Sequence, residues 1–128
     1  MKPPGLYADA QFAERTHAHE RALASLDSLL QAHGRHSVAN EARFRRARIH
    51  LARGDTTAAI EAFETLARDD PENPYADRSL FQQAQIQEAL GNPDAAAETY
   101  DRLLTEHPES LLTPNARTRL RALRQQQG

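Results

Sequence analysis

The sequence predicts an all-α fold, an α-α superhelix (solenoid) of three helix-turn-helix repeats followed by a C-terminal capping helix. The first observation is a recurrence every 37 positions, in which Gly54 returns as Gly91 and Pro71 returns as Pro108. A register kept in this way is typical of stacked copies of one supersecondary unit. The second observation is that no segment alternates polar and apolar residues or clusters β-branched residues, so no strand is expected.

The first repeat is placed at residues 3–39, with predicted helices over 6–16 and 19–33. Its apolar residues match those of the later repeats less closely. His17-Ala18 stands where the later repeats have Gly-Asp or Gly-Asn, which weakens the predicted turn between the two helices.

The second and third repeats have stronger signals at their helix ends. Gly54 and Gly91 each follow an apolar-periodic run, where the end of a helix needs a left-handed residue. Asp55 and Asn92 come next, and we expect their side chains to cap the following helices. The repeats are placed at 40–76 and 77–113, with helices over 38–53, 56–69, 74–90 and 93–106.

Small residues recur where the two helices of a repeat should meet. Ala47 and Ala59 occupy these places in the second repeat, and Ala84 and Ala96 occupy them in the third. Alanine lets two helices approach closely, so we expect alanine-lined seams inside each repeat.

A seventh helix, over residues 114–126 within a terminal segment 114–127, is predicted to close the array. Thr113-Pro114 supplies a capping residue followed by proline at the first helical position, and Asn73-Pro74 does the same before the third repeat. One side of this helix is apolar and the other is rich in Arg and Gln, as a capping helix requires. The apolar stripe consists of Ala116, Leu120 and Leu123.

The helix pairs resemble the tetratricopeptide repeat family over nearly the whole chain. The second repeat carries the resemblance in Ala42, Phe44, Ala47, Gly54, Asp55, Ala59, Phe63, Leu66 and Pro71; the third carries it in Leu80, Phe81, Ala84, Gly91, Ala96, Tyr100, Leu103 and Pro108. The family's commonest period is 34 residues. The longer link between repeats resembles a subgroup of bacterial envelope proteins, such as the TolA-binding cell-division coordinator and the barrel-assembly lipoprotein D.

The resemblance implies a concave surface lined by the first helix of each repeat, which binds a peptide or a partner helix. Tyr7, Phe44 and Phe81 would form an aromatic ladder there, with one residue from each repeat. Their alternative role is packing between neighbouring repeats. The partner-binding positions carried over from the family are Tyr7, Gln11, Phe44, Arg45, Arg48, Phe81 and Gln85.

Charge is distributed unevenly between the two helices of the second repeat. Residues 41–53 contain five Arg and one Glu, whereas 55–72 contain six acidic residues and one Arg. We therefore expect the groove to prefer an acidic partner, contacted by Arg48 and Arg119. The alternative is a solvated surface that salt screens.

The sequence holds no catalytic, cofactor or metal motif. It has no Gly-rich phosphate loop, no Gly-x-Ser-x-Gly and no His-Glu-x-x-His, so we expect no enzyme activity and no cofactor. The pairs His17/His19 and His33/His36 lack the i, i+4 spacing that places two ligands on one helix face, so no metal site is expected. A net charge of −2 gives no drive toward nucleic acid, and the absence of cysteine excludes disulfides.

Two functions remain open at this point. The favoured one is a non-catalytic protein-protein interaction scaffold, in a bacterial envelope assembly by the resemblance. The other is a self-association or spacer module, with a homodimer formed through the first repeat, where Leu6, Tyr7 and Phe12 have little cover. Residues 1–5 offer no apolar stretch for a signal peptide, and no membrane insertion is expected. The compartment stays open between periplasm and cytoplasm.

Overall fold

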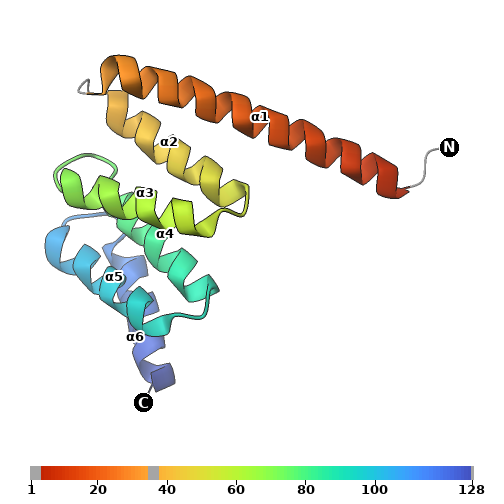
Figure 1. Cartoon of the computed structure of the whole chain (residues 1–128). Coiled ribbons are helices and arrows are strands. Elements are labelled where there is room, and N and C mark those ends of the chain that lie inside the picture. Colours follow the sequence, from red (N-terminus) through yellow and green to blue (C-terminus); the bar gives the residue numbers. More distant parts are fainter. Residues whose placement is uncertain (1–3, 35–37, 128) are drawn as a thin grey trace.

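Six helices follow one another in the computed structural model, which describes the backbone of residues 4–34 and 38–127 and the side chains within 15–34 and 38–126. These residues contain no strand, which confirms the all-α prediction. Each helix packs mainly against the next along the chain, so the helices form a stepped array (Figure 1). The helices are α1 (Pro4–His33), α2 (Val38–Ala52), α3 (Thr56–Asp69), α4 (Ala76–Ala89), α5 (Pro93–Glu106) and α6 (Thr113–Gln127).

The hairpins α2–α3 and α4–α5 turn on the two predicted glycines. Gly54 and Gly91 have φ values of 82° and 78°, in the left-handed region. The Asp55 amide donates to the His50 carbonyl at 2.9 Å and the Gly54 amide donates to the Leu51 carbonyl at 3.0 Å. The same pair of bonds recurs after α4. Together they form the Schellman motif, which satisfies the last carbonyls of a helix and reverses the chain.

The caps that precede α3, α4 and α5 differ from one another. Asp55 caps α3 as predicted, because its carboxylate accepts from the Ala58 amide at 3.3 Å. The Asn92 side chain makes no capping bond to the described backbone of α5, so that prediction was wrong. Asn73 is not a helix cap either. It is buried in the link between repeats, where its amide nitrogen donates to the Leu66 carbonyl at 2.9 Å.

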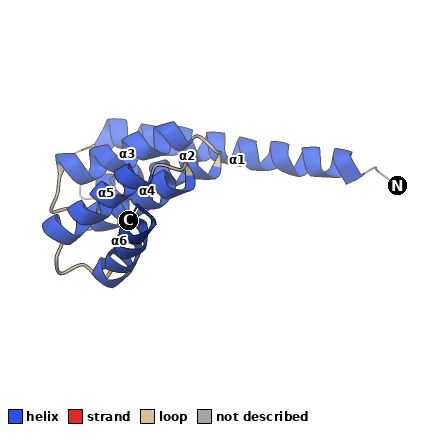
Figure 2. Ribbon diagram, turned by 90° about the horizontal axis from the view of Figure 1, so that it is seen from below, coloured by secondary structure: helices blue, strands red, loops and turns tan. Residues whose placement is uncertain are grey.

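The first repeat differs from its prediction. The expected helices 6–16 and 19–33 are one continuous helix of 30 residues, α1. The sequence reason lies at His17-Ala18, because neither residue adopts the left-handed conformation as readily as the glycines at 54 and 91 do. The N-terminal half of α1 consequently projects beyond the other helices (Figures 1 and 2).

The core follows the alanine seams and continues into α6. Ala47, Ala59, Ala84 and Ala96 are all fully buried, as predicted. The larger cluster runs from the end of α3 through α4 and α5 to α6, where the predicted apolar stripe is buried. Its members are Ala67, Leu80, Ala84, Ala96, Tyr100, Leu103, Ala116, Leu120 and Leu123. The capping role of α6 is thereby confirmed.

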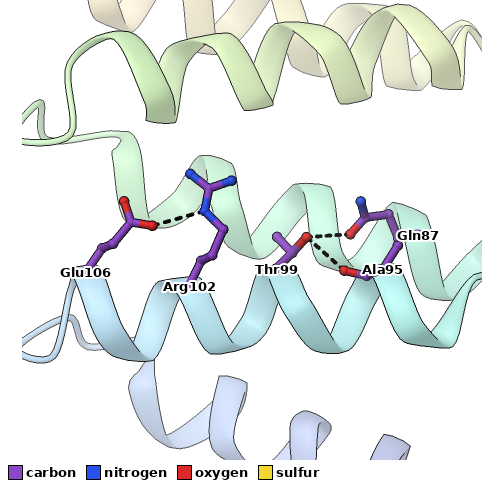
Figure 3. Close-up of polar contacts among 5 residues, drawn as sticks. All are labelled: Gln87, Ala95, Thr99, Arg102 and Glu106. Carbon is purple, nitrogen blue, oxygen red and sulfur yellow. Dashed lines mark hydrogen bonds and ion pairs between the residues drawn. The ribbon is translucent and has the colours of Figure 1, made fainter.

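A buried polar contact joins α4 to α5 beside this core. The Thr99 hydroxyl oxygen lies 2.7 Å from the Gln87 side-chain carbonyl and 3.0 Å from the Ala95 backbone carbonyl (Figure 3). Farther along the same side of α5, Arg102 donates to Glu106 at 3.0 Å (Figure 3). The first contact links two helices at a site that is 4% exposed, so it restrains how they pack, whereas the second supports one helix only.

Candidate protein-binding surface

We use the name first-helix face for the surface that carries Arg45 and Arg48 of α2, Gln85 and Leu90 of α4 and its C-terminal cap, and Arg119 of α6, all of which are exposed. α2 and α4 border a common pocket on this face. α4 and α6 are joined there by a hydrogen bond of 3.2 Å between Arg119 and Glu88. The three helices are therefore neighbours, as the family resemblance implies for the first helices of successive repeats.

An apolar pocket of about 250 Å³ opens on the first-helix face between α2 and α4. Leu51 reaches it from α2, while Ile86 and Leu90 reach it from α4 and its C-terminal cap. Leu90 is 50% exposed, so the pocket offers apolar surface to a ligand. The other lining residues are Thr56, Gln82, Gln85 and Ala89.

A second pocket, of about 360 Å³, lies between α1 and the end of α2. Its basic side chains are Arg15 and His19 of α1 and Arg53, which follows α2. The described residues that line it include no carboxylate, and Thr16 and Ala52 complete the lining. This concentration of donors suits an anionic group.

The two pockets overlap when the chain is shifted by 37 positions. Ala52 and Arg53 of the basic pocket are 37 positions before Ala89 and Leu90 of the apolar pocket, and His19 is 37 positions before Thr56. Repeat geometry therefore places a pocket at each step, and the side chains at these positions decide whether it is basic or apolar.

Arg45 and Arg48 lie on α2, about two turns and about one turn before Leu51, which lines the apolar pocket. Both are exposed, and neither forms a hydrogen bond or an ion pair with a described residue. By contrast, Arg46 on the other side of α2 donates to Asp27 of α1 at 2.9 Å. Arg45 and Arg48 are therefore available to an acidic partner.

The predicted aromatic ladder is only partly on the surface. Phe44 is 8% exposed. Its ring stacks on Tyr75, with 5.2 Å between ring centroids, and meets Phe63 edge-on at 5.6 Å. This burial agrees with the packing alternative for Phe44. Phe81 meets the Tyr100 ring edge-on at 5.6 Å and is half-buried, so part of it still reaches the surface.

The remaining predicted positions fall in two groups. Gln85 is exposed and lines the apolar pocket. Tyr7 and Gln11 lie in the N-terminal half of α1, in a stretch whose side chains are outside the described residues. Arg45, Arg48 and Gln85 are thus exposed and Phe81 is half-buried, and Gln85 alone among these four lines the apolar pocket.

Arg119 has a different role from the one expected for it. Its guanidinium donates to both carboxylate oxygens of Glu88, and the Tyr100 hydroxyl donates to one of them at 2.6 Å. The bond from Arg119 lowers the pKa of Glu88. Burial, reinforced by the bond to Glu88, raises the pKa of Tyr100. Arg119 therefore joins α6 to α4, so its guanidinium is already paired and a partner acid would have to displace Glu88.

Sequence reasoning missed the residues that give each pocket its character. These are Arg15, His19 and Arg53 in the basic pocket and Ile86 and Leu90 in the apolar one. The signal that could have found them is the 37-residue shift, which aligns Arg53 with Leu90 at a position outside the expected groove.

The described residues contain no group of three or more His, Asp or Glu side chains placed to hold a metal ion. None of their helices combines the length and the apolar character needed to cross a membrane.

Comparison with known families gave two matches. Two sequence models, both described as tetratricopeptide repeat, match residues 7–74 and 50–126. Each spans more than half of the chain, and together they cover residues 7–126, which include part or all of every helix. No curated protein matched the chain.

Proposed function

The chain belongs to the tetratricopeptide repeat family, whose repeats generally mediate protein-protein interactions, and we propose that it is a non-catalytic scaffold that binds a partner segment along the first-helix face. The observation that carries the proposal is the pair of equivalent pockets on that face, one basic and one apolar. Two chemically distinct pockets in a fixed order define both the composition and the direction of a ligand.

The ligand that fits this face is a peptide segment with acidic residues at one end and an aliphatic residue at the other. The acidic end would lie over Arg15 and Arg53 and continue along Arg45 and Arg48. The aliphatic side chain would enter the pocket beside Leu90, where Gln85 can bond to the peptide backbone. Charge pairs would set the association rate and the direction, and the apolar anchor would slow dissociation.

Fluorescence anisotropy with labelled synthetic peptides tests this proposal. One set carries Asp and Glu followed by Leu or Ile, and a matched set has Lys in place of the acids. We expect the acidic set to bind and the basic set not to bind. Arg45→Glu with Arg48→Glu should weaken binding at least tenfold, which corresponds to about 1.4 kcal/mol. Rising salt should weaken binding to the unaltered chain.

Arg121→Glu is the matched control, because this arginine is exposed on α6 and lies away from the first-helix face by helix periodicity. It should leave the affinity within a factor of about two of the unaltered chain, as expected for a distant surface charge at ordinary salt. If the variant with Arg45→Glu and Arg48→Glu binds the acidic peptides with the same affinity as the Arg121→Glu control, the first-helix face is not the binding surface.

We propose that this scaffold belongs to a protein assembly of the bacterial envelope. Its support is the resemblance of the 37-residue period, with the link over residues 71–78, to the envelope subgroup. Location of the natural protein by cell fractionation tests this part separately from peptide binding.

Self-association is the second candidate function, and one observation favours it. The described side chains of α1 include no fully buried residue, although Ala22, Leu26 and Leu29 stand at core positions of the repeat. A second copy that covers these residues would form a homodimer through the first repeat.

A further inference from the structure

Residues 19–33 of α1 lack one of the two neighbouring helices that cover α3, the equivalent helix of the next repeat. Ala59 and Phe63 of α3 are fully buried and Leu66 is 3% exposed. Their equivalents 37 positions earlier, Ala22, Leu26 and Leu29, are only partly buried. α3 is covered by α2 and by α4, whereas α1 packs mainly against α2. The missing cover corresponds to the first helix of the first repeat.

The residues that would form this first helix are present in the chain, but in the structure they lie away from the residues that they would cover. Residues 6–16 align with 43–53 of α2 and 80–90 of α4, so that Tyr7 matches Phe44 and Ala10 matches Ala47. In the structure these residues continue α1 in a straight line and project past the body (Figure 2). Without a turn at His17-Ala18, they cannot fold back onto residues 19–33 of their own chain.

We propose that two copies of this chain exchange residues 6–16. The first helix of a repeat runs antiparallel to the second, so residues 6–16 of one copy can pack against 19–33 of the other in the arrangement found within the later hairpins. The reciprocal contact forms at the same time around a two-fold axis near His17. The two α1 helices then lie antiparallel along their length, which is domain swapping with a closed, symmetric interface.

The exchange completes the first-helix face as well as the core. Tyr7 and Gln11 of the second copy would lie beside α2, at the positions that the resemblance assigns to the groove. The dimer would therefore extend the binding surface by one repeat at each end of the interface. This inference rests on the self-association proposed above and is independent of which peptide binds.

Crosslinking tests the exchange directly, because the chain has no cysteine of its own. Samples carrying Ala10→Cys and Ala22→Cys are unfolded together, refolded and then oxidised, so that two facing thiols can join as a disulfide. These positions are equivalent to Ala47 and Ala59, which are fully buried in one cluster. We expect a covalent dimer from the mixture and none from either sample alone. Equal crosslinking in the single-variant samples would overturn the proposed register.

Restoring the turn should reverse the exchange. His17→Gly with Ala18→Asp installs the pair found at Gly54 and Asp55, so residues 6–16 can fold back on their own chain. Light scattering should give twice the mass of one chain for the unaltered protein and a single chain mass for the variant, with helical circular dichroism retained in both. Ser28→Gly is the control for helix weakening, since it adds a glycine at an exposed position of α1, and it should stay dimeric.

The possible results distinguish the exchange from self-association and from peptide binding. A monomer at every concentration of the unaltered chain overturns both self-association and the exchange. The exchange alone is overturned if the unaltered chain is a dimer, the variant with His17→Gly and Ala18→Asp is also a dimer, and no crosslink forms between positions 10 and 22. The peptide experiment on Arg45 and Arg48 decides the first-helix face in either case.

Discussion

Glu88 is where side chains from three helices meet. It lies on α4, accepts from Tyr100 of α5 and accepts twice from Arg119 of α6. Its side chain is 18% exposed, so the charges are partly withdrawn from water, while Arg119 remains 44% exposed. The carboxylate satisfies the otherwise buried hydroxyl of Tyr100, a residue with no exposed surface. One residue thus couples the capping helix to the third repeat.

The stability of the chain should depend on pH through Glu88. Its pKa in the folded chain lies below the ordinary value of 4.5, chiefly because of the bond from Arg119. The stabilising contribution is therefore complete above pH 4.5 and is lost as the pH falls through the lower folded value. We expect urea unfolding to show this loss in the unaltered chain and a smaller loss in Glu88→Gln.

At neutral pH the Glu88→Gln change should lower the free energy of unfolding by about 1.5 kcal/mol, at the low end for a hydrogen bond to a charged group because Arg119 is partly exposed. Glu98→Gln, on the exposed side of α5, is the control and should change little. An unchanged pH profile for Glu88→Gln would show that the three-residue network does not stabilise the fold.

At the scale of the helical elements, the turn residue decides whether a repeat forms a hairpin or a single helix. Gly54 and Gly91 adopt left-handed conformations and reverse the chain, whereas the helix runs straight through His17. A Cβ built on Gly54 would meet no described atom within 4 Å. The requirement for glycine therefore comes from the backbone conformation and not from crowding.

Gly54→Ala should consequently destabilise the chain by about 1–2 kcal/mol, the cost of an L residue in the left-handed region. Gly54→Asn should cost less, because asparagine tolerates this region better than alanine does. Chemical denaturation of the two variants measures the difference. Equal losses for Ala and Asn would mean that the cost does not arise from the backbone conformation.

At the scale of the whole molecule, the two ends of the solenoid are not equivalent. α6 covers the C-terminal end with Leu120 and Leu123, which are 4% and 3% exposed. The N-terminal end presents α1 with its core positions half-covered. In the exchanged dimer proposed above, residues 6–16 of the second copy would cover these core positions.

Leu120→Ala and Leu123→Ala should each lower the free energy of unfolding by about 2–5 kcal/mol, because each creates a cavity under the cap. The double variant should also bind an apolar dye such as ANS, which reports exposed core surface. Arg117→Ala, exposed on the same helix, is the control. Unchanged stability in the leucine variants would mean that α6 does not close the core.

Much of the fold was predictable from local rules. Backbone preference explains the helix ends at Gly54 and Gly91. Side-chain volume and polarity explain the buried alanines and the apolar stripe on α6. Both properties can be read from the residue types. The candidate site was predictable only in part. Arg45, Arg48 and Gln85 are exposed as expected, and packing was already one of the two roles considered for Phe44, but its stacking partner Tyr75 was not predicted.

The sequence by itself determined the repeat period, the helical content, the hairpin turns and the family, because each depends on residues close together in the chain or on their recurrence. Only the tertiary structure decided which repeats share a pocket and that Arg119 is paired with Glu88. These outcomes depend on which side chains from different helices come within contact distance, and residue spacing along the chain does not contain that information.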